Sequence, residues 1–129
     1  MTVKILLALF CFMVSGLSSA ASDDVLLQQL LATELQSTPG TQVRVSRVSI
    51  PAHTSLPKHW HPGEEFAYLL DGEVTLWQLD KPEIAYKKGE LVNIPAKQVH
   101  TAITGAIGVE LLIFRIHEKG QPERVLAAQ

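Results

Sequence analysis

The chain has 129 residues, the length of one small domain, and its 13 acidic and 11 basic residues give a formal net charge of −2. This mildly acidic balance, with no cluster of basic residues, argues against a nucleic-acid partner and against binding to an anionic membrane surface. The one cysteine, Cys11, excludes a disulfide within the chain.

Residues 1–20 have the pattern of a secretory signal peptide. Lys4 gives a short basic start, residues 5–14 form an apolar run, and small residues follow up to Ala21. The apolar run is shorter than the roughly 20 residues that cross a bilayer, although an uncleaved anchor is the alternative. Cleavage is expected after Ala20 or Ala21, which predicts a secreted or periplasmic protein without further membrane contact.

Residues 21–40 are predicted to form an N-terminal helix, over residues 23–36, followed by a linker. Ser22 or Asp23 can cap this helix, and Pro39-Gly40 ends it. The apolar residues that recur near helical spacing are Leu26, Leu27, Leu30, Leu31 and Leu35. We expect this helix either to pack over the outside of the next domain or to form a dimer contact.

Residues 41–118 have the pattern of short strands separated by Gly and Pro turns, which predicts an all-β sandwich or barrel. Asp71-Gly72 is predicted to be a hairpin turn between strands at 66–70 and 74–79. Residues 66–70 and 111–114 are apolar on both faces, whereas a barrel needs only its inner face apolar. The apolar residues on the outer faces therefore predict that a second copy of the chain, in a homodimer, or the N-terminal helix covers them. The tail, residues 119–129, is expected to be irregular.

Four side chains in this region suit a divalent metal: His59, His61, Glu65 and His100. Alternate residues of a strand share a face, so His59 and His61 can point the same way, and Glu65 has the same parity. Imidazole nitrogens with one carboxylate suit a first-row transition ion and leave positions open for water or substrate. The H-x-H pair taken alone would fit two surface histidines equally well.

The spacing of these residues resembles the two sequence motifs of the cupin family. The first motif is an H-x-H pair followed by glutamate and glycine, and it matches residues 59–72. The second is a glycine followed by proline and histidine, and it matches residues 89–100. The resemblance covers residues 42–116, and two motifs in the right order make a specific signal.

The chain departs from the family pattern at three positions. His53 and Lys97 stand where the motifs have glycine, and Thr104 stands where the second motif has asparagine. The turn at Lys97 is put in doubt, because glycine would allow a positive φ without strain. The resemblance implies a double-stranded β-helix (jelly-roll) barrel over residues 41–118. It also implies one divalent transition metal ion (Fe, Mn, Ni, Cu or Zn) bound by His59, His61, Glu65 and His100.

Other side chains are placed by their parity on the predicted strands. The expected cavity lining consists of Ala67, Leu69 and Ala102, and the expected outward-facing aromatic residues are Trp60 and Tyr68. The arginines that could bind a substrate carboxylate are Arg44, Arg47 and Arg115, although solvated surface positions are the simpler interpretation. His53 and His117 are interpreted as surface or rim residues.

The resemblance implies a metal-dependent enzyme acting on a small organic molecule, most often an oxygenase, with decarboxylase, lyase and isomerase chemistry also represented. A nucleophilic hydrolase and a nucleotide enzyme are poor candidates, because the sequence has no Ser-His-acid set and no Gly-rich phosphate loop. The alternatives are a non-catalytic cupin that binds a small ligand or a metal, and a sensory or anti-sigma module. No catalytic base is identified from the sequence.

Overall fold

The structure is a computed structural model that describes residues 24–128, and these residues form an all-β fold. The strands are β1 (Leu26–Glu34), β2 (Thr41–Ile50), β3 (His59–Trp60), β4 (Glu64–Gln78), β5 (Ile84–Lys87), β6 (Leu91–Ile94), β7 (His100–Ile103), β8 (Val109–Glu118) and β9 (Val125–Leu126). The predicted signal peptide and its cleavage site lie outside these residues. Nowhere in residues 24–128 is there a helix long and apolar enough to cross a membrane.

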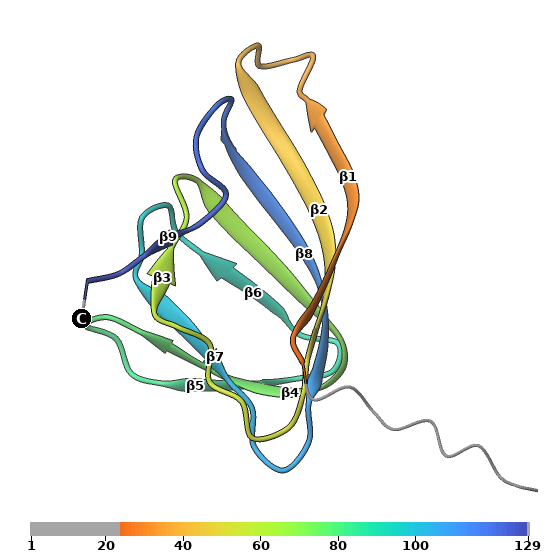
Figure 1. Cartoon of the computed structure of the whole chain (residues 1–129), viewed down its shortest axis with the longest axis vertical. Helices are drawn as coiled ribbons and strands as arrows, with labels where there is room; N and C mark the ends of the chain where they lie inside the picture. The colour runs from red at the N-terminus through yellow and green to blue at the C-terminus, as the bar shows by residue number, and fades with distance from the viewer. Residues whose placement is uncertain (1–23, 129) are drawn as a thin grey trace, which may run out of the picture.

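Two antiparallel sheets face each other and share one long strand, β4 (Figure 1). The first half of β4 pairs with β8 on one side and with β6 on the other. Beyond β8 lie β2 and the edge strand β1. The second half of β4 pairs with β5 and β7, and beyond β7 lie β3 and β9. This is the double-stranded β-helix, or jelly-roll, that the sequence predicted.

Asp71-Gly72 is not the predicted hairpin turn. The strand runs on through both residues, with a register shift between Leu69 and Asp71, and passes from one sheet to the other. Gly72 has φ 77°, and a Cβ there would collide with the carbonyl oxygen of Gly108. A glycine is therefore required at this corner by a close backbone approach, and not by a chain reversal.

The predicted N-terminal helix over residues 23–36 is wrong, because residues 26–34 form strand β1. A register shift between Gln29 and Leu31 interrupts the alternation of β1 along β2. Residues four apart share a face in a regular strand as well as in a helix, so the leucine spacing fits both, and the bulge then turns the later residues to the opposite face. Antiparallel pairing with β2 makes this segment a strand. All nine residues of β1 are exposed.

The departures from the family motifs have visible backbone consequences. His53 and Lys97, which replace glycines, both take left-handed backbone conformations, with φ 54° and 62°. Thr104, which replaces asparagine, is buried, and its hydroxyl donates a hydrogen bond to the Pro51 carbonyl oxygen at 2.6 Å and accepts one from the Thr54 amide at 2.9 Å. Thr104 thus holds the loop that contains the strained His53.

The core lies between the sheets and follows the alternation of the strands. Ile50 and Leu69 are its most completely buried apolar residues, at 1% and 0% exposure. On β8, alternate residues from Val109 to Ile113 point inward, and the outward-facing neighbours are partly or fully exposed. The aromatic residue Tyr68 is exposed, as predicted from its parity.

The predicted irregular tail carries strand β9, which pairs with β3 beside the His59–His61 segment. Glu123, just before β9, forms ion pairs with Arg115 at 2.7 Å and with Arg44 at 3.3 Å. These contacts place the tail at the mouth of the barrel, where the candidate site lies.

Candidate metal centre

Three buried histidines converge at one end of the barrel. His59 begins β3, His61 follows that strand, and His100 begins β7 directly opposite His59. One ring nitrogen from each lies within 4.8 Å of the others. The sheet pairing therefore brings together residues some forty positions apart in the sequence, as the two motifs predicted.

The backbone fixes the same tautomer in all three rings. The Nδ1 atoms of His59, His61 and His100 lie 2.8, 2.6 and 2.8 Å from the carbonyl oxygens of Pro57, Glu123 and Gln98. A carbonyl oxygen can only accept, so each Nδ1 carries a hydrogen, and Nε2 is the nitrogen that each ring can offer to a metal. This is the outer support that metal-bound histidines have in proteins.

Burial favours the neutral form of two of these rings, His59 and His100. It lowers the pKa of His59 from 6.5 to about 4, although the hydrogen bond to Pro57 opposes the shift. Burial also lowers the pKa of His100 below its ordinary value, against the hydrogen bond to Gln98. Since a metal binds only unprotonated imidazole, His59 and His100 are prepared as ligands at neutral pH.

The Nε2 atoms of His61 and His100 are buried and have no hydrogen-bond partner among residues 24–128. Glu65 carboxylate oxygens nevertheless lie 3.0 Å from His61 Nε2 and 3.9 Å from His100 Nε2. Buried polar atoms without a partner are unfavourable, and a divalent cation among them would satisfy these lone pairs. The donor set of three imidazoles beside one carboxylate therefore fits a transition metal ion.

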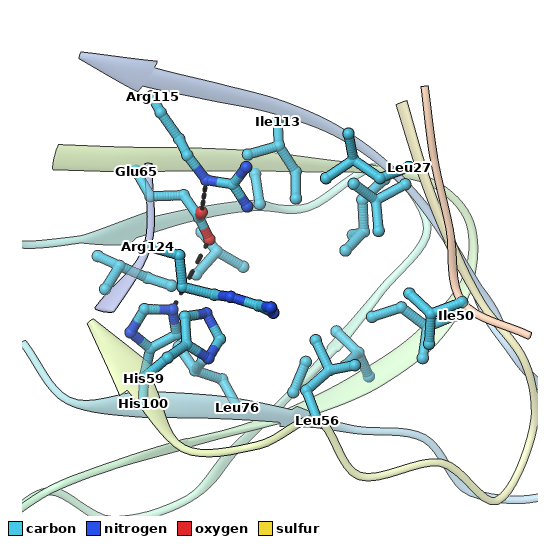
Figure 2. Close-up of a pocket in the computed structure, with 18 of the residues that line it drawn as sticks. Leu27, Ile50, Leu56, His59, Glu65, Leu76, His100, Ile113, Arg115 and Arg124 are labelled. Atoms are coloured by element: carbon cyan, nitrogen blue, oxygen red, sulfur yellow. Dashed lines mark hydrogen bonds and ion pairs between the residues drawn. The ribbon is translucent and has the colours of Figure 1, made fainter. Parts of the chain in front are cut away.

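Glu65, on β4, is buried, and its Oε2 accepts a 2.6 Å hydrogen bond from Arg115 Nε (Figure 2). Burial raises the pKa of Glu65, but the close approach of His61 and the charge of Arg115 outweigh burial and hold that pKa well below its usual range. The carboxylate is therefore ionised. It lies beside His61 and His100, next to the group of three mutually close histidine nitrogens, where it can serve as the predicted fourth ligand.

Several residues of this end were either placed differently or not identified from the sequence. Arg115 is 8% exposed and forms part of the site, whereas a solvated position was the simpler expectation. His117 is buried, so its interpretation as a surface or rim residue is wrong, whereas His53 is exposed as predicted. The signal for Arg115 and His117 was present in the alternation of β8, whose inward positions they share with Ile113. No such signal marks Glu123 or Arg124.

His59 and His100 open onto a cavity of about 660 Å³, a volume typical of small-molecule sites. Its body is apolar, and its polar lining consists of His59, Glu65, His100, Arg115, Glu123 and Arg124. The predicted lining residues Ala67 and Ala102 are present, whereas Leu69 belongs to the packed core instead. Leu27 of β1 lines the apolar end, far from Glu65 (Figure 2).

Comparison with known proteins agrees with this architecture. The family profile described as "Cupin domain" matches residues 46–110. Among functionally curated proteins, no significant sequence relative is found.

Solved structures with the same fold are only distantly related in sequence. The DMSP lyase DddQ from Ruegeria pomeroyi has a TM-score of 0.66 and 22% identity, over 80% of this chain and 51% of the lyase chain. This chain thus spans about half the length of that enzyme. A cupin superfamily protein from Desulfitobacterium hafniense has a TM-score of 0.64 and 19% identity, over 77% of this chain and 83% of that one. An RmlC-like cupin from Methanocaldococcus jannaschii has a TM-score of 0.63 and 16% identity, over 89% and 94% of the two chains.

Proposed function

The chain belongs to the cupin family, and from this premise we propose that it is a metal-dependent enzyme, of the oxygenase class, that acts on a small organic molecule in the barrel cavity. The observation that carries the proposal is the set of three converging, backbone-supported histidines at the polar end of a large apolar cavity. Such a site can hold a metal while a substrate occupies the adjoining space.

His59, His61 and His100 would hold the ion, with Glu65 as the fourth ligand. A divalent transition ion bound there supplies Lewis acidity and, if it is redox-active, a site for O2. Arg115 keeps Glu65 ionised and fixes its orientation through the 2.6 Å hydrogen bond. The apolar walls exclude water, which strengthens the electrostatic interactions at the polar end.

Metal content tests the site. Elemental analysis of the purified native protein is expected to find about one transition ion per chain, and His61→Ala is expected to lose it. The matched control is His53→Asn, an exposed histidine outside the cluster, because asparagine tolerates the left-handed backbone found there. Equal metal content in His61→Ala and the wild type would refute the assignment.

Turnover separates an enzyme from a binding protein. We expect O2 consumption with one or more small phenols, thiols or enols, lost in His61→Ala and retained in His53→Asn. The fold shared with a DMSP lyase makes anaerobic lyase assays a useful second screen. A protein that binds metal but turns over no substrate with Fe, Mn, Ni, Cu or Zn would instead be a non-catalytic cupin.

We also infer that the mature protein is exported. The basic start, apolar run and small residues of residues 1–21 support this inference. N-terminal sequencing of the protein from a periplasmic or secreted fraction is expected to begin at Ala21 or Ser22. A chain that retains Met1 and stays in the cytoplasm would contradict it.

A homodimer is the proposed assembly. Leu31, Val45, Phe114 and Phe66 are cross-strand neighbours on the outer face of one sheet, and Leu31 and Phe114 are 47% and 37% exposed. The same apolar face on two copies can form a two-fold interface. Light scattering is expected to give the mass of a dimer for the wild type and of a monomer for Phe114→Glu. Leu126→Glu, outside this face, is the control. A monomeric wild-type protein would exclude the dimer.

A further inference from the structure

The cavity contains one arginine whose charge is not compensated. Arg115 and Arg124 are the two guanidinium groups that line it. Arg115 is paired with two carboxylates, through Nε with Glu65 at 2.6 Å and through Nη1 with Glu123 at 2.7 Å. Arg124 forms no ion pair or hydrogen bond with any part of the chain between residues 24 and 128. Figure 2 shows its side chain projecting into the cavity, on the side of His59 and His100.

The charges at this end sum to an excess of positive charge. Glu65 and Glu123 offset Arg115 and Arg44, with which they are paired, and the charge of Arg124 is left over. A divalent cation at the histidines would add to this excess. The polar end of the cavity therefore attracts an anion.

The backbone at Arg124 is also held next to the histidine cluster. The preceding residue, Glu123, accepts a hydrogen bond from His61 Nδ1 at its backbone carbonyl, at 2.6 Å, and its carboxylate binds both Arg115 and Arg44. The following residue, Val125, pairs with Trp60 of β3. The backbone on both sides of Arg124 is thus fixed, so its exposed side chain starts from a defined place beside the metal-binding residues.

The remaining walls of the cavity indicate that the body of a ligand is apolar. Its body is lined by aliphatic side chains from both sheets, among them Ile50, Leu56, Leu76, Val92 and Ile113. Such walls accept an apolar group and penalise a polar one, which would lose its hydrogen bonds to water. Within residues 24–128 the lining contains no helix N-terminus, which is a common binding element for phosphate, so a carboxylate head group fits better than a phosphate.

We propose that Arg124 binds the carboxylate of a monocarboxylate ligand whose apolar body occupies the cavity. The planar guanidinium can donate two parallel hydrogen bonds to a carboxylate. The inference rests on the proposed function, because it names the substrate class of the same cavity. It makes Arg124 a specificity-determining residue, and it places the carboxylate beside the metal-binding histidines.

The test is calorimetric titration of the zinc-loaded protein with hexanoate, octanoate and 3-phenylpropanoate, and with 1-octanol as the uncharged probe. At least one carboxylate is expected to bind the wild type. Arg124→Gln is expected to weaken its binding by about tenfold or more, the usual effect of losing a charge-assisted hydrogen bond, while Arg124→Lys retains part of the affinity. Binding of 1-octanol and the zinc content are expected to stay unchanged in both variants.

The matched control is Arg47→Gln, which removes an exposed arginine paired with Glu110 on the outer face of the sheet and should leave carboxylate binding unaltered. Absence of binding for all three carboxylates, or equal affinities in the wild type and Arg124→Gln, would overturn the inference. The zinc content is measured separately. A wild type that binds no metal but shows Arg124-dependent carboxylate binding would refute the proposed function and leave this inference standing.

Discussion

The two ends of the cavity are built by different means. The apolar end is formed by many aliphatic residues that alternate along long strands, and each has similar neighbours on either side. The polar end is formed by a few side chains from β3, β4, β7, β8 and the C-terminal segment, each with one specific partner. The apolar end therefore determines stability through the sum of its contacts, whereas single residues of the polar end determine chemistry.

The largest expected effect is the loss of metal in His100→Ala. Removing one of three imidazoles from the cluster should lower metal affinity by 100-fold or more, on the order of the losses seen even when the supporting partners of metal ligands are removed. Competition with a chromophoric chelator measures the change. Unchanged affinity would show that the polar end is not the metal site.

Arg115→Gln should destabilise the protein by about 3–5 kcal/mol in the metal-free state, because it leaves the buried Glu65 carboxylate without its cation. Bound metal should reduce this loss, since the cation offers Glu65 another positive partner. Urea unfolding with and without zinc measures both values. An equal loss in the two states would indicate that Glu65 does not interact with the metal.

Leu76→Ala, at the apolar wall, should lower the free energy of unfolding by about 2–5 kcal/mol, as is usual for truncation of a buried leucine. Its metal affinity should remain that of the wild type, which is the opposite of the result expected for His100→Ala. If Leu76→Ala also lost the metal, the two ends would not be separable.

The metal-free protein should lose stability as the pH falls from about 6.5 toward about 4. His59 has a pKa of about 4 when folded and 6.5 when unfolded, so the unfolded chain takes up its proton first in this range. The lowered pKa of His100 acts in the same direction. Urea unfolding at several pH values measures the slope, and His59→Gln should flatten it. A wild-type stability that does not change between pH 6.5 and 4.5 would contradict the burial of neutral histidines.

The smallest effect is expected at the strained turn next to the site. Lys97 is exposed at φ 62°, and its amide donates a 2.8 Å hydrogen bond to the His61 carbonyl oxygen. Lys97→Gly should stabilise the protein by about 0.5–1 kcal/mol, because relief of the left-handed strain exceeds the entropy lost by glycine. Lys81→Gly, where φ is not positive, should destabilise it slightly. Thermal unfolding compares the two variants, and equal shifts would exclude strain at Lys97.

The barrel and the histidine cluster could be predicted from the sequence because both depend on local rules. Strand alternation predicted that His59 and His61 share one face, and the spacing of the second motif predicted that His100 joins them. The helix prediction failed because leucines four residues apart share a face in a strand as well as in a helix, and pairing with β2 is a long-range effect. The hairpin turn at Asp71-Gly72 was predicted wrongly for a similar reason. Gly72 is required by the close approach of the Gly108 carbonyl oxygen, which the local sequence does not show.

The rest of the polar end depends on contacts between distant segments. Arg115 could have been identified from its inward parity on β8, but Glu123 and Arg124 lie in a short segment without periodicity. Their positions follow from the pairing of β9 with β3 and from the bond between His61 and the Glu123 carbonyl oxygen. A single sequence contains no local signal for either contact.

The most direct test of the central claim is X-ray absorption spectroscopy of the zinc-loaded protein, which counts imidazole ligands. The account predicts three histidine nitrogens at roughly 2.0–2.1 Å, together with oxygen ligands, and two histidine nitrogens in His100→Ala at saturating zinc. A wild-type spectrum with no imidazole scattering, or one that His100→Ala leaves unchanged, would show that the metal does not bind at this histidine cluster.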